Sequence, residues 1–143
     1  MAKWDGVDWV AFNPPVIEEF RATKGQPGGR WAGNPMILLT TVGARSGREL
    51  TSPLTYNLDG GDIVVIASAA GAPKSPAWYH NLVAHPDVVV ELGEERFAAR
   101  AEVAAEPERT RLFDDRIALM PRFGEYQQKT TRTIPVVVLR RIP

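Results

Sequence analysis

The chain contains 143 residues and has a mass of 15.8 kDa, which fits one domain of ordinary size. Hydrophobic residues make up 44% and charged residues 24% of the sequence, a mixture typical of a globular protein rather than a disordered one. Lysine plus arginine and aspartate plus glutamate both number 17, so the basic excess of a nucleic-acid-binding protein is missing. The absence of cysteine excludes disulfide bonds, thiolate nucleophiles and cysteine-ligated metal clusters.

The sequence carries no targeting or membrane-spanning signal. No apolar run approaches the roughly 20 residues that a transmembrane helix needs. The segment from Met1 to Val10 contains Asp5 and Asp8 and lacks the apolar centre of a secretory signal peptide. We therefore expect a cytoplasmic protein, with peripheral membrane contact as the alternative.

Residues 1–34 are predicted to form an N-terminal segment around one short helix. The helix is expected from Val16 to Lys24, directly after Pro14-Pro15, and the glycine-rich stretch that follows ends it. Three tryptophans are expected to anchor this segment to the body of the protein rather than to a membrane or partner: Trp4, Trp9 and Trp31.

From residue 35 to residue 143 the sequence has the short apolar runs of β-strands. Hairpin signals such as Asp59-Gly60-Gly61-Asp62 favour antiparallel pairing over a parallel, doubly wound sheet. The run from Ile63 to Ala67 is apolar on both faces, which predicts a strand in the middle of the sheet. We predict an antiparallel β-barrel with helices packed outside it. Its six strands are Met36 to Val42, Thr51 to Leu58, Ile63 to Ala67, Val88 to Leu92, Arg96 to Val103 and Pro135 to Leu139.

Prolines mark the helices that interrupt these strands. Ser75 is expected to be the N-cap, and Pro76 the first residue, of a helix that continues from Ala77 to Ala84. The dipeptide His85-Pro86 ends it, because the residue before a proline avoids the helical conformation.

A second helix is expected after Pro107. Pro121 breaks it, and a further short helix is expected from Phe123 to Lys129. Three apolar side chains recur at helical spacing before the break: Phe113, Ile117 and Met120.

Several familiar catalytic motifs are missing. The sequence has no dinucleotide-binding G-x-G-x-x-G, no phosphate-binding G-x-x-x-x-G-K-[ST] and no nucleophile elbow G-x-S-x-G. His80 and His85 are five residues apart on or beside a helix, about 140° around its axis, so they cannot readily share a metal ion. The remaining signals are two loops suited to anions or flat ligands.

The first loop runs from Gly43 to Arg48 between two strands. Its glycines let backbone N–H groups turn toward one point, Ser46 adds a hydroxyl, and Arg45 and Arg48 add positive charge. This combination suits a phosphate or a carboxylate. The alternative is an ordinary polar hairpin turn.

The second loop, from Ser68 to Pro76, is built mostly of small residues, so a flat ligand could approach its backbone closely. The free N–H groups of the helix beyond Ser75 would make another anion site. Trp78 and Tyr79 follow directly, and we expect one ring in the core and the other beside a pocket.

Three segments resemble the deazaflavin-dependent nitroreductase family of actinobacteria, in the same order and with similar spacing: LLTTVGARSGRELTSPLTY, ASAAGAPKSPAWYHNL and EYQQKTTRTIPVVVL. The resemblance covers the chain from about Pro15 to its C-terminus. It implies a small split β-barrel of the FMN-binding split-barrel type that uses the deazaflavin coenzyme F420 and no metal.

The resemblance also implies which residues contact the coenzyme. The R-S-G loop and the strand after it would hold the phosphate and tail, the A-S-x-x-G segment would touch the ring, and the start of the P-x-W-Y-x-N helix would add contacts. The implied cofactor-binding residues are Ala44, Arg45, Ser46, Leu50, Thr51, Ser52, Pro53, Leu54, Thr55, Ile66, Ala67, Ser68, Ala69, Ala77, Trp78, Tyr79, His80 and Asn81. The candidate catalytic hydroxyl groups are those of Ser68 and Tyr126.

The chain departs from the family pattern at the substrate pocket. Met120 and Phe123 stand where members of the family carry tyrosines, and only Tyr126 remains. An apolar side chain offers no hydrogen bond to a nitro oxygen, so we expect quinones or enones to be reduced better than nitroimidazoles. Ala44 replaces a second basic residue of some members, which leaves Arg45 and Arg48 for the anionic tail.

The predicted function is reduction of a small, planar, electron-poor acceptor (a quinone, an activated enone or a nitroaromatic) by hydride from reduced F420. Because the coenzyme carries the difficult chemistry, such a protein needs neither a triad nor a metal. Two alternatives stay open: an FMN-dependent oxidoreductase on the same barrel, and a deazaflavin carrier without turnover. The expected partners are a small-molecule acceptor and no nucleic acid, with the chain as a monomer or a homodimer.

Overall fold

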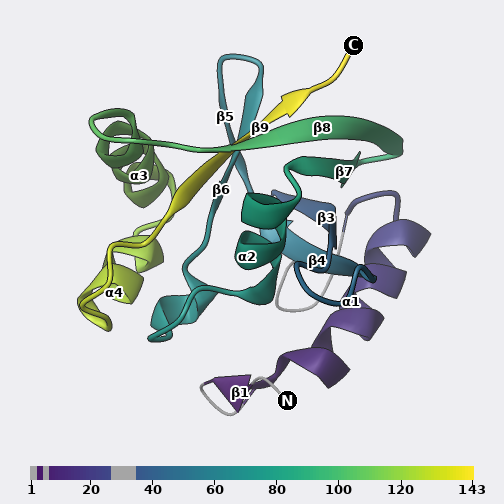
Figure 1. The fold of residues 1–143 in the computed structure, drawn as a ribbon, viewed down its shortest axis with the longest axis horizontal. Coiled ribbons are helices and arrows are strands. Elements are labelled where there is room, and N and C mark those ends of the chain that lie inside the picture. Colours follow the sequence, from purple (N-terminus) through teal and green to yellow (C-terminus); the bar gives the residue numbers. More distant parts are fainter. Residues whose placement is uncertain (1–2, 5–6, 27–34) are drawn as a thin grey trace.

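The computed structural model describes residues 3–4, 7–26 and 35–143 (Figure 1). A two-stranded antiparallel ribbon, β1 (Lys3–Trp4) and β2 (Val7–Asp8), precedes helix α1 (Trp9–Ala22). The anchoring expected of the three tryptophans concerns side chains outside the described part of the chain.

Helix α1 is longer than its proline pattern predicts. It begins at Trp9 rather than after the two prolines, which lie inside it, and it ends at Ala22. Each proline removes one backbone hydrogen bond, but its fixed φ suits a helix. Packing stabilises the second half instead, because Val16 and Phe20 are buried against the apolar strand β3 (Met36–Val42). The packed half is the part that the sequence predicts; the structure adds Trp9 to Pro15 before it and ends the helix at Ala22 rather than Lys24.

Seven strands of the described chain form one antiparallel sheet that curls into a half-barrel, in the order β4-β3-β7-β8-β9-β6-β5 (Figure 1). The remaining strands are β4 (Glu49–Thr55), β5 (Asn57–Asp59), β6 (Asp62–Ile66), β7 (Asp87–Leu92), β8 (Glu95–Val103) and β9 (Val136–Arg141). The antiparallel, mainly β architecture is confirmed, as is the hairpin at Asp59-Gly60-Gly61-Asp62.

The predicted number of six strands is wrong because one predicted strand is divided. The stretch from Thr51 to Leu58 splits at Tyr56 into β4 and β5. Strand β4 pairs with β3, whereas β5 pairs with β6 at the opposite end of the strand order. A continuous stretch whose halves pair with opposite edges of a sheet must bend, and it draws those edges together.

The central position predicted for the run from Ile63 to Ala67 is also wrong. Strand β6 lies next to the edge strand β5. Its two faces are nevertheless both buried, because Ile63 and Val65 face one apolar cluster and Val64 and Ile66 face another. Burial on both faces reflects a helical layer outside the barrel rather than a central place in the sheet.

The two apolar clusters lie on opposite faces of the sheet. The inner cluster includes Trp78 and Leu82 of helix α2 (Ala77–Ala84). The outer cluster packs α3 (Glu108–Leu119) and α4 (Arg122–Gln128) over β6 and β9. No helix among the described residues is long and apolar enough to cross a membrane.

Helix α2 starts with a different cap from the expected one. Pro76, in an extended conformation, is the N-cap, and no side chain caps the helix. The Ser75 hydroxyl lies instead 3.1 Å from a guanidinium nitrogen of Arg132. The Ser75 hydroxyl oxygen therefore accepts from the charged Arg132 guanidinium instead of capping the first N–H groups of α2. The predicted end of the helix, at His85, is confirmed.

A fully buried arginine joins α3 to the bend between β4 and β5. Arg116 is 0% exposed, and it donates to Asn57 Oδ1 and to the Val64 carbonyl, each at 2.7 Å. It also donates to Thr55 Oγ1 at 3.3 Å. Burial, with a smaller contribution from Arg122, lowers the pKa of the Arg116 guanidinium to about 10. This side chain therefore connects both halves of the divided strand to β6.

Replacing Gly25 with alanine is expected to destabilise the fold by about 2–4 kcal/mol. Gly25 follows α1 with a φ of +87°, and a Cβ atom there would lie 2.7 Å from the Cα atom of Gly93. Gly60, with a φ of +62° and no atom near its Cβ position, is the matched control, and its alanine variant should lose only about 1 kcal/mol. Urea denaturation measures both losses, and equal losses would refute a close backbone contact at Gly25.

Candidate functional site

The loop between β3 and β4 is folded tightly by its own polar groups. The Gly43 N–H donates to the Arg48 carbonyl at 2.7 Å, and the Arg48 N–H donates to Ser46 Oγ at 3.1 Å. The Ser46 hydroxyl therefore keeps its hydrogen for another acceptor. Arg45 and Arg48 are exposed, and neither forms an ion pair with a residue that the structure describes. Two cations and one hydroxyl are thus available to an anion at this loop.

Asn81 fastens this loop to helix α2. Its Oδ1 atom accepts from the Ala44 N–H at 3.0 Å, and its Nδ2 atom donates to Thr41 Oγ1 at 3.1 Å. The side chain is buried at 8% exposure, so the bond to Thr41 is shielded from water, whereas the bond to exposed Ala44 is part-buried. The structure thereby brings together two sequence-predicted site residues, Ala44 and Asn81, that are 37 positions apart.

Strand β4 carries the residues expected to hold the coenzyme tail. It stands at one end of the strand order, so its outer edge has backbone groups without a strand partner in that sheet. The residues from Leu50 to Thr55 are half-buried except Ser52, which is 5% exposed. Thr51 Oγ1 lies 2.8 Å from Thr40 Oγ1 of β3, which fixes the middle of the strand.

The loop between β6 and α2 has a strained backbone. Ala69, Ala70 and Gly71 have φ values of +47°, +54° and +84°, in the left-handed region that side chains disfavour. A Cβ atom on Gly71 would lie 2.9 Å from the carbonyl oxygen of Tyr126, so the loop packs closely on α4. Strain of this kind is typical of functional sites.

Sequence reasoning missed the residue that holds this loop. The Arg132 guanidinium donates to the carbonyl oxygens of Ala67, Ser68 and Ala72 at 3.2, 2.9 and 3.0 Å, and to Ser75 Oγ. Burial lowers the pKa of Arg132, and the nearby Tyr79 opposes that shift. The residue stands inside the motif EYQQKTTRTIPVVVL, but nothing in the local sequence indicates its contacts.

The predicted ring-contact residues Ile66, Ala67, Ser68 and Ala69 lie at the end of β6 and the start of this loop. Ser68 is 7% exposed, and its Oγ atom has no hydrogen bond to any described residue. Because α2 begins where this loop ends and is bonded to the first loop through Asn81, it joins the two loops.

The predicted α2 residues differ in their surroundings. Trp78 is 5% exposed and belongs to the inner cluster, whereas Tyr79 is half-buried against that cluster. Ala77 and His80 are exposed, and the His80 ring meets the Tyr79 ring edge to face at 5.5 Å. No group of three or more potential metal ligands is found among the described residues.

The pocket side chains expected on the last helices lie in the outer cluster. Met120 and Phe123 are 8% and 4% exposed, so neither presents a free surface in this conformation. The Phe123 ring has the Arg116 guanidinium 4.8 Å from its centroid on one side and the Tyr126 ring at 5.2 Å on another. Tyr126 is half-buried, and its backbone adjoins Gly71.

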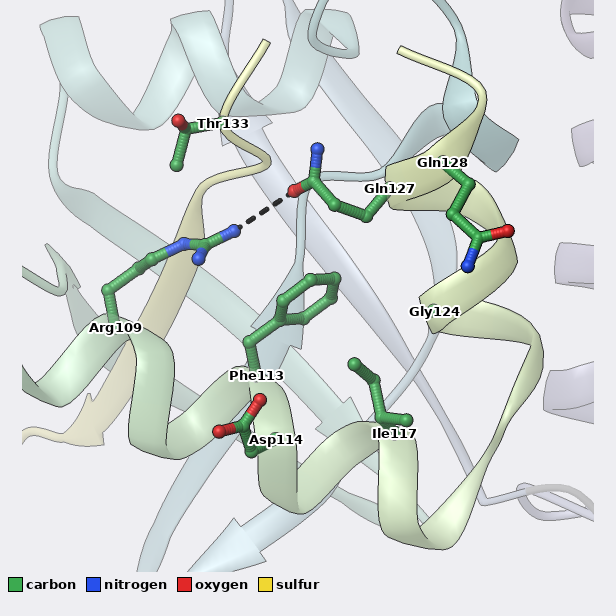
Figure 2. A pocket seen from close by; sticks show the side chains of 8 residues that line it. All are labelled: Arg109, Phe113, Asp114, Ile117, Gly124, Gln127, Gln128 and Thr133. Atoms are coloured by element: carbon green, nitrogen blue, oxygen red, sulfur yellow. Dashed lines mark hydrogen bonds between the residues drawn. The ribbon is translucent and has the colours of Figure 1, made fainter. Parts of the chain in front are cut away.

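A pocket of about 520 Å³ lies elsewhere, between α3 and α4 (Figure 2). It contains none of the predicted site residues. Figure 2 shows Arg109 at its rim, bonded to Gln127, above the ring of Phe113. Its lining residues are Arg109, Phe113, Asp114, Ile117, Gly124, Gln127, Gln128 and Thr133.

Comparisons with known proteins identify the family. A family model described as F420H(2)-dependent quinone reductase matches residues 15–141. The F420H(2)-dependent quinone reductase of Mycobacterium tuberculosis H37Rv is 41% identical over 128 residues, which cover 85% of each chain.

Solved structures point to the same family. The chain is similar to an F420-H2 dependent reductase with a TM-score of 0.68 and 36% identity, covering 74% of this chain and 94% of the other. A domain-swapped dimer is similar with a TM-score of 0.70 and 34% identity, covering 93% of this chain and 98% of the other. The predictions of an F420-using family and of a reductase are confirmed. The chain belongs to the F420H(2)-dependent quinone reductase family.

Proposed function

We propose that this protein reduces quinones with F420H2, which it holds between the loop from Gly43 to Arg48, the edge strand β4 and the start of the loop after β6. The observation that carries the proposal is the joining of these segments. Asn81 bonds the first loop to α2, and Arg132 bonds the second loop to the start of the same helix. Segments that the family resemblance implicates separately are therefore held as one unit.

The residues of this unit fit the coenzyme's chemistry. Arg45, Arg48 and the Ser46 hydroxyl would bind its phosphate and anionic tail, since no described side chain neutralises either arginine. The small side chain of half-buried Ala69 lets a flat ring approach the backbone, and Ser68 Oγ has no partner among the described residues. When bound, reduced F420 supplies a hydride.

Hydroxyl groups near the second loop have a role in handling the acceptor's oxygen. A quinone that receives a hydride also takes up a proton, and an oxygen that gains negative charge is stabilised by a hydrogen-bond donor. Ser68 and Tyr126 supply the hydroxyl donors for this role, on segments that Gly71 brings into contact. We propose them as the groups that orient the acceptor and stabilise its developing charge.

The Arg45→Ala variant is expected to bind oxidised F420 roughly fivefold more weakly at low salt, because an exposed charge contact contributes about 1 kcal/mol. Its affinity should also depend less on salt than that of the wild type. Titration at two ionic strengths measures both effects. The matched control is Arg96→Ala, which removes an exposed arginine from β8, far along the chain from both loops. Unchanged affinity at low salt would remove Arg45 from the site.

Two further properties can be measured directly: the choice of coenzyme and the oligomeric state. F420 is favoured over FMN by the family match, and parallel titrations with both coenzymes test that preference. A homodimer is favoured by the solved relative described as a domain-swapped dimer, and analytical ultracentrifugation tests it.

A further inference from the structure

We infer that Arg132 is a positioning residue that turns the peptide groups of Ser68 and Ala69 so that their N–H groups face the bound ligand. Four of its contacts fall on a single loop, from the Ala67 carbonyl to the Ser75 hydroxyl. The Arg132 guanidinium forms no ion pair with any described residue, and all the acceptors to which it donates are neutral groups of this loop. The identity of the ligand rests on the proposed function, whereas the contacts of Arg132 with the loop after β6 do not depend on it.

The geometry follows from the planarity of the peptide bond. In a trans peptide the C=O and N–H groups point in opposite directions. The carbonyl oxygens of Ala67 and Ser68 both accept from Nη2 of Arg132, at 3.2 and 2.9 Å. The N–H groups of the same two peptide units belong to Ser68 and Ala69, and they must point away from the guanidinium.

These N–H groups have no acceptor in the described part of the chain. Ser68 Oγ, on the same residue, also lacks a partner, although Ser68 is 7% exposed. Buried donors are normally satisfied, so the unpaired donors of buried Ser68, next to the N–H group of half-buried Ala69, indicate a bound acceptor. Two backbone N–H groups and one hydroxyl suit a carbonyl or enolate-like oxygen of a planar ring.

The strained backbone explains why a guanidinium is needed. The residues after Ser68 hold φ values of +47° and +54°, which alanine adopts only under constraint. A planar guanidinium can donate to several acceptors at once from fixed directions, whereas a lysine ammonium is a point charge. Arg132→Lys therefore keeps the charge and loses the set of contacts.

The experiment compares Arg132→Lys with Arg109→Lys. Arg109 lies at the rim of the outer pocket (Figure 2) and bonds the Ile134 carbonyl and Gln127 without touching the loop after β6. If Arg132 only fastened the segment before β9, the two variants would behave alike.

For Arg132→Lys we expect faster hydrogen–deuterium exchange at residues 67–76 of the coenzyme-free protein, with unchanged exchange in β7 and β8. We also expect at least tenfold weaker binding of oxidised F420 and loss of any shift in its absorption maximum on binding. Arg109→Lys should leave loop exchange and the spectrum of bound F420 unchanged.

Ser75→Ala removes one of the four contacts and is the second test variant if Arg132→Lys fails to fold. We expect it to accelerate hydrogen–deuterium exchange in the loop and to weaken F420 binding two- to threefold. The inference is overturned if Arg132→Lys, or Ser75→Ala in its place, leaves loop exchange and affinity unchanged, or if Arg109→Lys produces the same losses. A wild-type protein that does not bind F420 would refute the proposed function alone, because the exchange comparison needs no coenzyme.

Discussion

Replacing Arg116 with methionine is expected to lower the free energy of unfolding by about 2–4 kcal/mol. The substitution removes the donor to the buried acceptors Asn57 Oδ1 and the Val64 carbonyl, and to the half-buried Thr55 Oγ1. Each unsatisfied group costs about 1–3 kcal/mol. Removal of a buried cation offsets part of this sum, because the lowered pKa of Arg116 shows that burial disfavours its charge. Loss of the donors should prevail, since three acceptors depend on one side chain.

Urea denaturation at neutral pH measures this loss, and Arg111→Met is the matched control on the same helix. Arg111 is exposed and pairs with Asp59 and Glu108 at the surface, where solvent screens the charges. Its replacement should therefore cost much less than that of Arg116. Equal losses for the two variants would contradict the assigned role of the buried arginine.

The stability difference between wild type and Arg116→Met should also increase at high pH. Folding lowers the pKa of Arg116 to about 10. Above that pH the unfolded chain, in which the arginine keeps its ordinary higher pKa, binds more protons than the folded chain. Stability rises with pH wherever the unfolded state binds more protons. The wild type should gain stability over the variant as the pH rises from 9 to about 11. If the stability difference between wild type and Arg116→Met instead became smaller over this pH range, the predicted direction of the pH effect would be wrong.

The Asn81→Leu variant is expected to bind F420 at least about tenfold more weakly and to lose about 2 kcal/mol of stability. Leucine fills a similar volume but neither accepts from the Ala44 N–H nor donates to Thr41 Oγ1. The loop that carries Arg45 would no longer be fixed to α2, so its cations would lose their position relative to the second loop.

Calorimetric titration with oxidised F420 and thermal denaturation measure the two effects of Asn81→Leu. Asn57→Leu is the matched control, because it makes the same exchange at a buried asparagine that accepts a 2.7 Å bond from Arg116 and is not a predicted site residue. It should cost stability while leaving coenzyme affinity within about threefold of wild type. If both variants weaken binding equally, Asn81 has no specific role in placing the loop.

Local sequence patterns predicted most of the fold because alternation, turn residues and prolines act over a few neighbours. The hairpin at Asp59-Gly60-Gly61-Asp62 and the helix break at Pro121 are of this kind. The division of one strand at Tyr56 depends on pairing with two partners distant in sequence, β3 and β6. The pattern of residues from Thr51 to Leu58 does not indicate that its two halves pair with different strands.

The candidate site divides in the same way. The Gly43-to-Arg48 loop was predictable from its composition, and the family motifs indicated the second loop. The connections between them were not, because Asn81 reaches back 37 positions to Ala44 and Arg132 reaches back 64 to Ser68. Polar side chains with distant partners leave no local pattern, and arginines on amphipathic helices normally face solvent, which is why buried Arg116 was missed as well.

Anaerobic mixing of the protein with F420H2 and a soluble quinone tests the central claim most directly. Appearance of oxidised F420, followed by its absorbance, should require both protein and quinone, and FMN should not replace the coenzyme. Bound F420H2 that stays reduced in the presence of every quinone tried would contradict the account and leave a deazaflavin carrier as the function.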